Sequence, residues 1–261
     1  MEKYYKTESA NICYKVHQQQ KKKAIVFIHG FGITKEMWDK QLDDLKAYKV
    51  ITVDVPHHGK STSQKPLNLI HVCKEIVGIL DQEGIEKTVI AGLSMGNYIA
   101  QEFVRLYPER TQGIFLADGS PIYMRYSKWE TLSLKRSQPL FKLYTWERLK
   151  KAMARQSSVV NEVQSELIKM FDTQTKDSFI RSWSAIANAL HEEDVNIISP
   201  MCYVYGEQDR TGTIQLHVKD WQVCYPKCEV HMIPNAGHVS NMDNPKVFNQ
   251  ILVDFLQKIY V

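Results

Sequence analysis

Short continuous runs of apolar residues recur along the chain, and most of them end at a glycine or a polar residue. This pattern is typical of strands that are buried on both faces of a parallel sheet. The runs occupy residues 24–30, 48–55, 87–92, 113–118 and 200–206, and a last strand is expected at 228–233. Residues 4–8 and 12–17 instead alternate between apolar and polar side chains, which predicts two antiparallel strands joined by a short turn.

Segments with helical periodicity separate these predicted strands. They span residues 35–47, 69–83, 95–106, 214–223 and 245–260. The last segment is the clearest, because its apolar residues fall on one stripe of an amphipathic helix. Strands that alternate with helices predict an α/β fold, in which helices cover both faces of a mostly parallel sheet.

Residues 121–195 interrupt this alternation, since they contain helical segments rich in Tyr, Trp, Leu, Lys and Arg but no buried-strand run. We therefore predict a helical lid inserted into a core domain made of residues 1–120 and 196–261. The first half of the lid is basic, with eight Lys or Arg against two Glu between Lys128 and Arg155. Such an excess favours an anionic substrate if it faces the site, although a charge run more often forms a solvated helix face.

The composition is that of an ordinary globular protein, with 261 residues, 44% hydrophobic and 24% charged. The formal net charge of +4 is too small to indicate a nucleic-acid partner. The opening residues are polar, and no segment approaches the roughly 20 apolar residues that span a bilayer. We expect a cytoplasmic enzyme that acts on a small molecule and has neither a nucleic-acid nor a membrane partner. The oligomeric state stays open.

The five cysteines follow no spacing known for disulfide frameworks, and their odd number favours thiols over disulfides. Cys224, Cys228 and His231 lie near one another in the sequence, but they supply only three ligands and match no zinc pattern. We predict neither a metal nor a cofactor.

The segment GLSMG at residues 92–96 has the form G-x-S-x-G and lies between a predicted strand and a predicted helix. In this position the glycines permit a tight turn that raises Ser94 above the sheet, and the start of the helix stabilises negative charge. The motif alone is weak evidence, because it occurs by chance and a serine can simply cap a helix. Its place between strand and helix predicts a nucleophilic serine.

A serine nucleophile needs a histidine base, which in turn needs a carboxylate to orient it. His238 lies in a glycine-containing loop between the last strand and the last helix, where an imidazole can reach the serine. Two carboxylates follow core strands, Asp118 and Asp209. We favour Asp209, because it completes the order serine, acid, histidine, and keep Asp118 as the alternative acid.

Acyl chemistry also requires backbone N–H groups that bind the oxyanion. One donor is typically the amide that follows the nucleophile, which here is Met95. The second is expected from the loop HGFG at residues 29–32, where Phe31 is the candidate.

Together, HGFG, DVPHHGKS (54–61), GLSMG, GEQD (206–209) and AGH (236–238) resemble the α/β-hydrolase superfamily over nearly the whole chain. The resemblance is to small lidded enzymes that include carboxylesterases, perhydrolases, carbon–carbon bond hydrolases and MenH-like lyases. It implies the α/β-hydrolase fold, the triad and the two amides named above. In two places the sequence departs from the common pattern: His57 and Asn97 stand where relatives carry glycine.

Three functions follow from these observations. The first is hydrolysis of a small carboxylic ester or thioester through an acyl-serine intermediate. The second uses the same triad for carbon–carbon bond hydrolysis or MenH-like elimination on an anionic substrate that the basic lid binds. The third is a ligand-binding module without turnover, because fold alone does not fix function.

Overall fold

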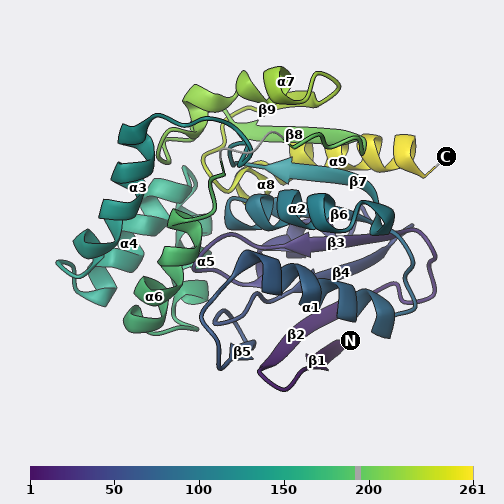
Figure 1. Ribbon diagram of the computed structural model, residues 1–261, viewed down its shortest axis with the longest axis horizontal. Coiled ribbons are helices and arrows are strands. Elements are labelled where there is room, and N and C mark those ends of the chain that lie inside the picture. The colour runs from purple at the N-terminus through teal and green to yellow at the C-terminus, as the bar shows by residue number, and fades with distance from the viewer. Residues whose placement is uncertain (192–194, 261) are drawn as a thin grey trace.

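The computed structural model describes residues 1–191 and 195–260, and its strands form one mixed sheet (Figure 1). The strand order is β1-β2-β4-β3-β6-β7-β8-β9, and β5 pairs with β2. The strands are β1 (Glu2–Lys6), β2 (Ala10–His17), β3 (Ala24–Ile28), β4 (Lys49–Val53), β5 (Thr62–Ser63), β6 (Thr88–Leu93), β7 (Thr111–Ala117), β8 (Met201–Gly206) and β9 (Glu229–Ile233). From β4 to β9 the neighbouring strands are parallel, whereas β2 pairs antiparallel with β1, β4 and β5. The predicted α/β fold is therefore confirmed.

Helices cover both faces of the sheet, and successive side chains of its central strands point to opposite faces. In β3, Val26 and Ile28 pack into the cluster that includes α1 (Leu69–Gln82) and α2 (Met95–Leu106). Ile25 and Phe27 pack into the second cluster, which includes α9 (Pro245–Ile259). The continuous apolar strands of the sequence thus reflect burial on two sides.

Two predicted helices differ from the structure. Residues 35–47 form the 3₁₀-helix η1 (Lys35–Gln41) followed by turns, and residues 214–223 form η3 (Ile214–His217) and the short α7 (Asp220–Cys224). In the first case a buried carboxylate fixes the backbone: the Lys35 amide and Nζ donate to Asp54 at 2.9 and 2.6 Å. In the second, the Gln215 side chain donates to the carbonyl of Gly206 at 2.6 Å, which ties the short turn to β8. Tertiary hydrogen bonds therefore outweigh the helical periodicity of these segments.

Two further short elements complete the core. They are η2 (Pro108–Arg110) before β7 and α8 (Ser240–Asp243) after the His238 loop.

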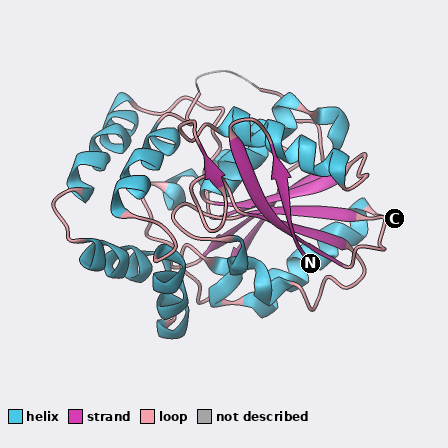
Figure 2. Ribbon diagram, turned by 90° about the horizontal axis from the view of Figure 1, so that it is seen from below, coloured by secondary structure: helices cyan, strands magenta, loops and turns pink. Residues whose placement is uncertain are grey.

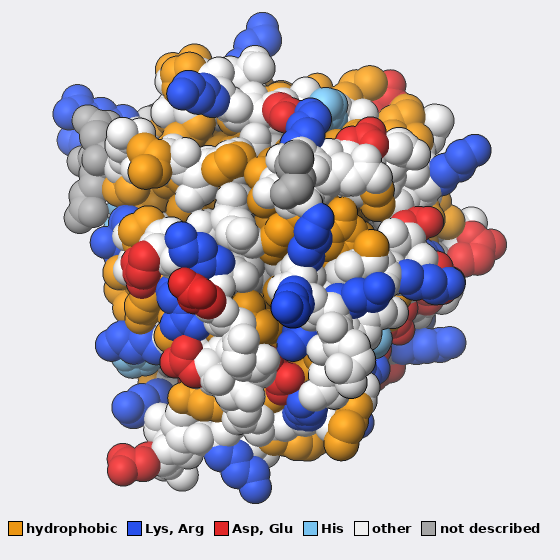
Figure 3. Space-filling model, turned by 90° about the vertical axis from the view of Figure 1, so that its right-hand side faces the viewer, with side chains coloured by type: hydrophobic (Ala, Val, Ile, Leu, Met, Phe, Trp, Pro, Cys, Tyr) orange, Lys and Arg blue, Asp and Glu red, His pale blue; other side chains and the backbone are white. Residues whose placement is uncertain are grey.

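Four helices lie between β7 and β8 in the chain and sit beyond the carboxyl ends of the parallel strands (Figures 1 and 2). They are α3 (Lys128–Phe141), α4 (Trp146–Ser157), α5 (Asn161–Phe171) and α6 (Lys176–Ala187). α3 packs against α6 and α4 against α5. The opposite side of the molecule carries basic and acidic side chains that are interspersed (Figure 3).

Candidate active site

Ser94 occupies a strained turn between β6 and α2. Its φ of 55° lies in the left-handed region that residues other than glycine rarely adopt. The glycines on either side leave no room for a side chain, since a Cβ on Gly92 would lie 1.9 Å from the Gly96 carbonyl oxygen. A Cβ on Gly96 would lie 2.1 Å from the carbonyl oxygen of Ile28. The turn therefore requires the glycines of the GLSMG motif, and it leaves the Ser94 side chain half-buried.

The structure brings Ser94, His238 and Asp209 into one hydrogen-bonded chain. The Nε2 atom of His238 lies 2.8 Å from Ser94 Oγ, and its Nδ1 atom lies 2.9 Å from Asp209 Oδ2. Asp209 is oriented in turn by the Thr211 amide, which donates to Oδ1 at 2.8 Å. His238 and Asp209 are both buried. Because the three residues come from loops after β6, β9 and β8, the carboxyl edge of the sheet assembles them.

Burial and charge act in opposite directions on this pair. Burial opposes ionisation of His238, but the charge of Asp209 and the hydrogen bond to it outweigh burial and raise the histidine pKa above its usual 6.5. Burial likewise opposes ionisation of Asp209, yet the interactions with His238 and Thr211 lower its pKa. The site therefore favours a carboxylate beside a histidine whose protonated form is stabilised.

Asp118, the alternative acid, makes different contacts. Its Oδ1 accepts from the Gly206 amide at 2.8 Å, and its Oδ2 accepts from the amide and the hydroxyl of Ser240 at 3.0 and 2.6 Å. Burial and the negative charge of Asp209 raise the pKa of Asp118 to about 8. Asp118 thus ties the end of β8 to the segment that follows His238, and it is Asp209 that contacts the His238 ring.

The two residues predicted to donate to the oxyanion are Met95, which follows Ser94 in the chain, and Phe31, which lies in a neighbouring loop. Met95 is the first residue of α2, and Phe31 follows Gly30, whose Cβ position would lie 3.6 Å from Ser94 Cβ. Within the described part of the chain, neither the Phe31 nor the Met95 amide donates a hydrogen bond. His29 holds the base of the Phe31 loop, because its Nε2 accepts from the Val55 amide at 2.9 Å.

Both departures from the family pattern keep the local backbone in place. His57 adopts the positive φ of 68° that a glycine would take, and its Nε2 atom lies 2.8 Å from the Lys65 carbonyl oxygen. The side chain of Asn97 accepts from Gln101 at 2.6 Å, and Gln101 also accepts from the Ile122 amide at 3.0 Å. These bonds link α2 to the segment that leads to α3.

The sequence motifs do not include Tyr98 and Ser120, whose side chains meet beside the first turn of α2. Tyr98 is one helical turn beyond Ser94, half-buried on the same side of α2, and its hydroxyl lies 3.3 Å from Ser120 Oγ. The spacing of four residues on a helix is a signal that could have identified Tyr98. Ser120 carries no such signal, because only the fold brings it there.

Aromatic side chains of α6, supported by one from α3, pack against the loop that carries Phe31. The Phe31 ring lies 4.6 Å from the ring of Phe179 and 5.2 Å from that of Trp183, and Phe141 packs edge-on against both. These side chains form an aromatic cluster around the Phe31 ring. The eight basic residues between Lys128 and Arg155, for which a solvated helix face is the more common arrangement, are mostly at the surface: seven of the eight are exposed, and Lys150 pairs with Glu147 and Asp172.

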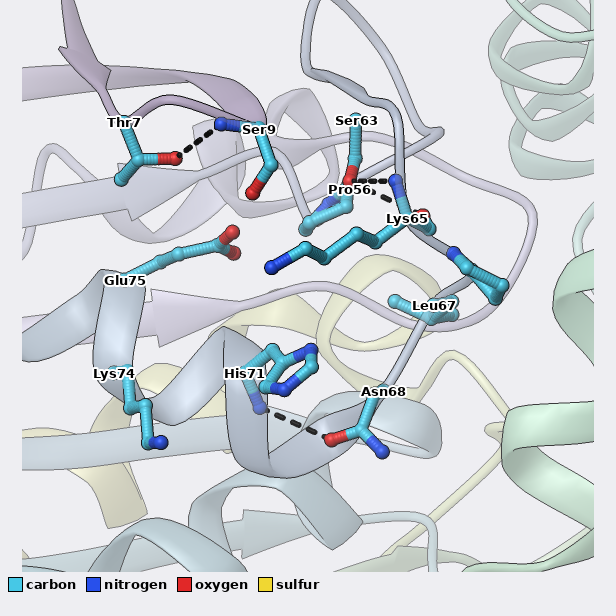
Figure 4. Close-up of a pocket in the computed structure, with 11 residues that line it drawn as sticks. Thr7, Ser9, Pro56, Ser63, Lys65, Leu67, Asn68, His71, Lys74 and Glu75 are labelled. Carbon is cyan, nitrogen blue, oxygen red and sulfur yellow. Dashed lines mark hydrogen bonds between the residues drawn. The ribbon is translucent and has the colours of Figure 1, made fainter.

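Other features lie away from the Ser94 site. A cavity of about 240 Å³ lies between the β1–β2 turn and the start of α1, and Lys65 reaches across it toward Ser9 and Glu75 (Figure 4). Among the described residues, no three His, Cys, Asp or Glu side chains are grouped so that they could hold a metal ion, and Cys228 and His231 belong to no such group. No helix in the described ranges has the length and apolar character needed to cross a bilayer.

Comparison with known proteins places this arrangement in a family. Residues 25–251 match the model of the alpha/beta hydrolase family. The chain is 28% identical to a 2-hydroxy-6-oxononadienedioate/2-hydroxy-6-oxononatrienedioate hydrolase of Paraburkholderia phymatum, over 90% of this chain and 87% of the relative. It is 22% identical to a pimeloyl-[acyl-carrier protein] methyl ester esterase of Yersinia enterocolitica, over 90% and 93%.

A solved structure of similar fold is a thermophilic esterase from Thermogutta terrifontis, with a TM-score of 0.85, 19% identity and full coverage of both chains. The family model covers most of this chain, and the named relatives are hydrolases. The protein therefore belongs to the alpha/beta hydrolase family.

Proposed function

We propose that the protein is a serine hydrolase that cleaves a small carboxylic ester or thioester through an acyl-serine intermediate. The observation that carries this proposal is the hydrogen-bonded chain from Ser94 Oγ through His238 to Asp209. A serine becomes nucleophilic when a histidine accepts its proton, and the histidine is a stronger base when a carboxylate stabilises its protonated form.

In the proposed reaction, Ser94 Oγ attacks the substrate carbonyl carbon while His238 Nε2 accepts the serine proton. The negative charge moves to the carbonyl oxygen, which binds the amides of Phe31 and Met95. His238 then donates the proton to the departing alcohol or thiol, and an acyl-serine ester remains. Water, deprotonated by His238, attacks this ester and releases the acid. Asp209 positions the imidazole throughout.

We further propose that residues 121–195 act as a lid over a core domain formed by residues 1–120 and 196–261. The contacts of Phe141, Phe179 and Trp183 near Phe31 support this division, because they place an apolar wall beside the proposed oxyanion loop. An apolar wall favours a substrate whose acyl or alcohol group is apolar.

The test is covalent labelling with a fluorophosphonate probe, which reacts with activated serines. The parent protein and the control Ser133→Ala, which alters an exposed serine on α3, are expected to be labelled. Ser94→Ala is expected to lose labelling and hydrolysis of p-nitrophenyl esters. Equal labelling of Ser94→Ala would refute the proposal.

A second candidate is carbon–carbon bond hydrolysis or MenH-like elimination by the same residues. Its support is the similarity to a relative named for a dioate substrate, since the exposed basic side chains of the lid offer little. Turnover of a vinylogous diketone acid, with inactivity on an ester panel of varied acyl length, would favour it. Rapid hydrolysis of short esters, without inhibition by dicarboxylates, would count against it.

A binding module without turnover is the third candidate. Turnover that is abolished in His238→Ala would exclude it.

A further inference from the structure

The outer side of α3 carries a stripe of exposed apolar side chains. Trp129, Leu132 and Leu140 are 75%, 39% and 55% exposed, and Leu143, just past the helix, is 81% exposed. With 100° of rotation for each residue, the three helical positions fall within a sector of about 80°. Arg136, which is also exposed, falls within the same sector, so the stripe carries one cation among its apolar side chains. An exposed apolar stripe of this kind is unusual on a folded protein and indicates a binding surface.

A row of lysines runs along one edge of this stripe. Lys128, Lys135 and Lys142 are spaced by seven residues, so that they lie on the same side of the helix, and all three are exposed. Within the described part of the chain, none of the three forms an ion pair. The acidic residue of the helix, Glu130, is engaged by Ser127 and by His217 Nε2 at 2.7 Å. The lysine charges therefore remain available to a partner.

The inner side of α3 holds the helix in place without using the stripe. Gln138 Nε2 donates to the Ile180 carbonyl at 2.7 Å, and Trp183 Nε1 donates to Ser137 Oγ at 2.9 Å. Phe141 packs against Trp183 with ring centroids 5.1 Å apart. Because these contacts attach α3 to α6, the outward Trp and Leu side chains are not needed for packing.

We propose that this outer face of α3 docks on an anionic phospholipid bilayer. A Trp and several Leu that lie beside a row of Lys are the arrangement of helices that rest in the plane of a membrane interface. The apolar side chains enter the acyl boundary, and the lysine stems follow them while their charges reach the phosphates. Charge complementarity thus selects an anionic surface.

The expectation of no membrane partner rested on the absence of a spanning segment, and the proposed docking departs from that expectation. α3 has 14 residues, too few to span a bilayer, and a helix that lies flat on a surface needs no such length. The proposed docking is independent of the chemistry at Ser94, because it uses none of the residues proposed for the reaction.

The experiment is flotation of the full chain with vesicles of phosphatidylglycerol and phosphatidylcholine, compared with vesicles of phosphatidylcholine alone. We expect binding to the anionic vesicles and quenching of Trp129 fluorescence by brominated lipid. Replacement of all three lysines (Lys128→Gln, Lys135→Gln, Lys142→Gln) should weaken binding on the order of 100-fold. The control triple variant Lys21→Gln, Lys22→Gln, Lys87→Gln removes three exposed charges elsewhere and should bind as the parent does.

The apolar stripe is tested separately with Trp129→Ser combined with Leu140→Ser. Ile198→Ser combined with Val223→Ser removes apolar side chains that are 82% and 75% exposed elsewhere, and it serves as the control. Circular dichroism and fluorophosphonate labelling report whether each variant is folded. The stripe variant should lose vesicle binding and the control should retain it.

Three results would overturn the proposal. The first is failure of the parent to bind anionic vesicles, and the second is vesicle binding that both the triple lysine variant and the Trp129→Ser, Leu140→Ser variant retain. The third is self-association of a protein that does not bind vesicles, if Leu140→Ser with Leu143→Ser abolishes that self-association. The last result would assign the stripe to a second copy of the chain. Vesicle binding can succeed or fail whatever the labelling of Ser94 shows, so the two proposals are tested independently.

Discussion

Replacement of Asp209 by asparagine removes the carboxylate that contacts His238 Nδ1 at 2.9 Å and keeps nearly the same shape. The side chains of Asp209 and His238 are almost fully buried, so solvent screens the interaction between them only weakly. With charge centres about 4 Å apart and an effective dielectric constant of about 20, the pair contributes about 4 kcal/mol. This stabilisation acts when His238 becomes protonated during the attack, and its loss corresponds to about a thousandfold decrease in kcat. We expect KM to change little, because the interaction strengthens only in the transition state.

The same variant should change the pH profile in a defined direction. His238 acts as a base in its neutral form, so kcat/KM of the parent should rise with pH through the pKa of His238, which lies above 6.5. Asp209 stabilises the protonated ring and raises this pKa. Asp209→Asn should therefore move the acidic limb of the profile to lower pH while the plateau falls.

The assay is steady-state hydrolysis of p-nitrophenyl esters between pH 5 and 9 by the parent, Asp209→Asn and Asp118→Asn. Asp118 accepts its hydrogen bonds from Gly206 and Ser240, so its replacement should lower the free energy of unfolding by about 1–3 kcal/mol and reduce kcat less than tenfold. The reasoning fails if Asp118→Asn loses more kcat than Asp209→Asn, or if Asp209→Asn stays within tenfold of the parent.

Three further predictions concern stability and selectivity. Gly92→Ala places a Cβ 1.9 Å from the Gly96 carbonyl oxygen and should cost at least about 3 kcal/mol in urea unfolding, together with the loss of probe labelling. Asp54→Ala removes the buried carboxylate beside Lys35 and leaves only that of Glu36, 3.2 Å away, so it should lower the free energy of unfolding by about 3–5 kcal/mol in urea unfolding. A smaller loss would show that Glu36 or water compensates the Lys35 charge. Phe179→Ala removes a buried ring that contacts Phe31 and should lower the free energy of unfolding by about 3–5 kcal/mol. The variant should also prefer larger acyl groups in a panel of esters of increasing chain length. An unchanged preference would place Phe179 outside the substrate site.

Much of the sheet could be predicted because its local signals agree with its final environment. Each predicted strand occurs within two residues of its expected ends, since continuous apolar runs become buried strands wherever helices cover both faces. The candidate site followed from the same logic. Ser94, Asp209 and His238 follow separate strands of the sheet, and parallel strands bring their carboxyl ends to one edge.

Features that depend on distant contacts escaped prediction. The segment after Thr34 has helical periodicity, but two hydrogen bonds from Lys35 to Asp54 shape it into a 3₁₀-helix and turns. Asp118 and Asp209 both follow core strands, and nothing in the local sequence predicts that Asp118 accepts a hydrogen bond from Ser240. Such outcomes depend on which donors the fold brings within reach, which spacing along the chain does not encode.

The substrate is hard to infer for a related physical reason. The elbow that holds Ser94 is determined by steric limits on Gly92 and Gly96, and those limits are the same for any acyl group. In the neighbouring loop, the Phe31 ring touches the rings of Phe179 and Trp183. A change in the packing of these rings therefore alters both the room for a substrate and the support of the loop that carries the Phe31 amide. If the Phe31 amide binds the oxyanion as proposed, selectivity and oxyanion binding are coupled through the contacts of Phe31 with Phe179 and Trp183, and the packing of the inserted helices then governs the choice of substrate.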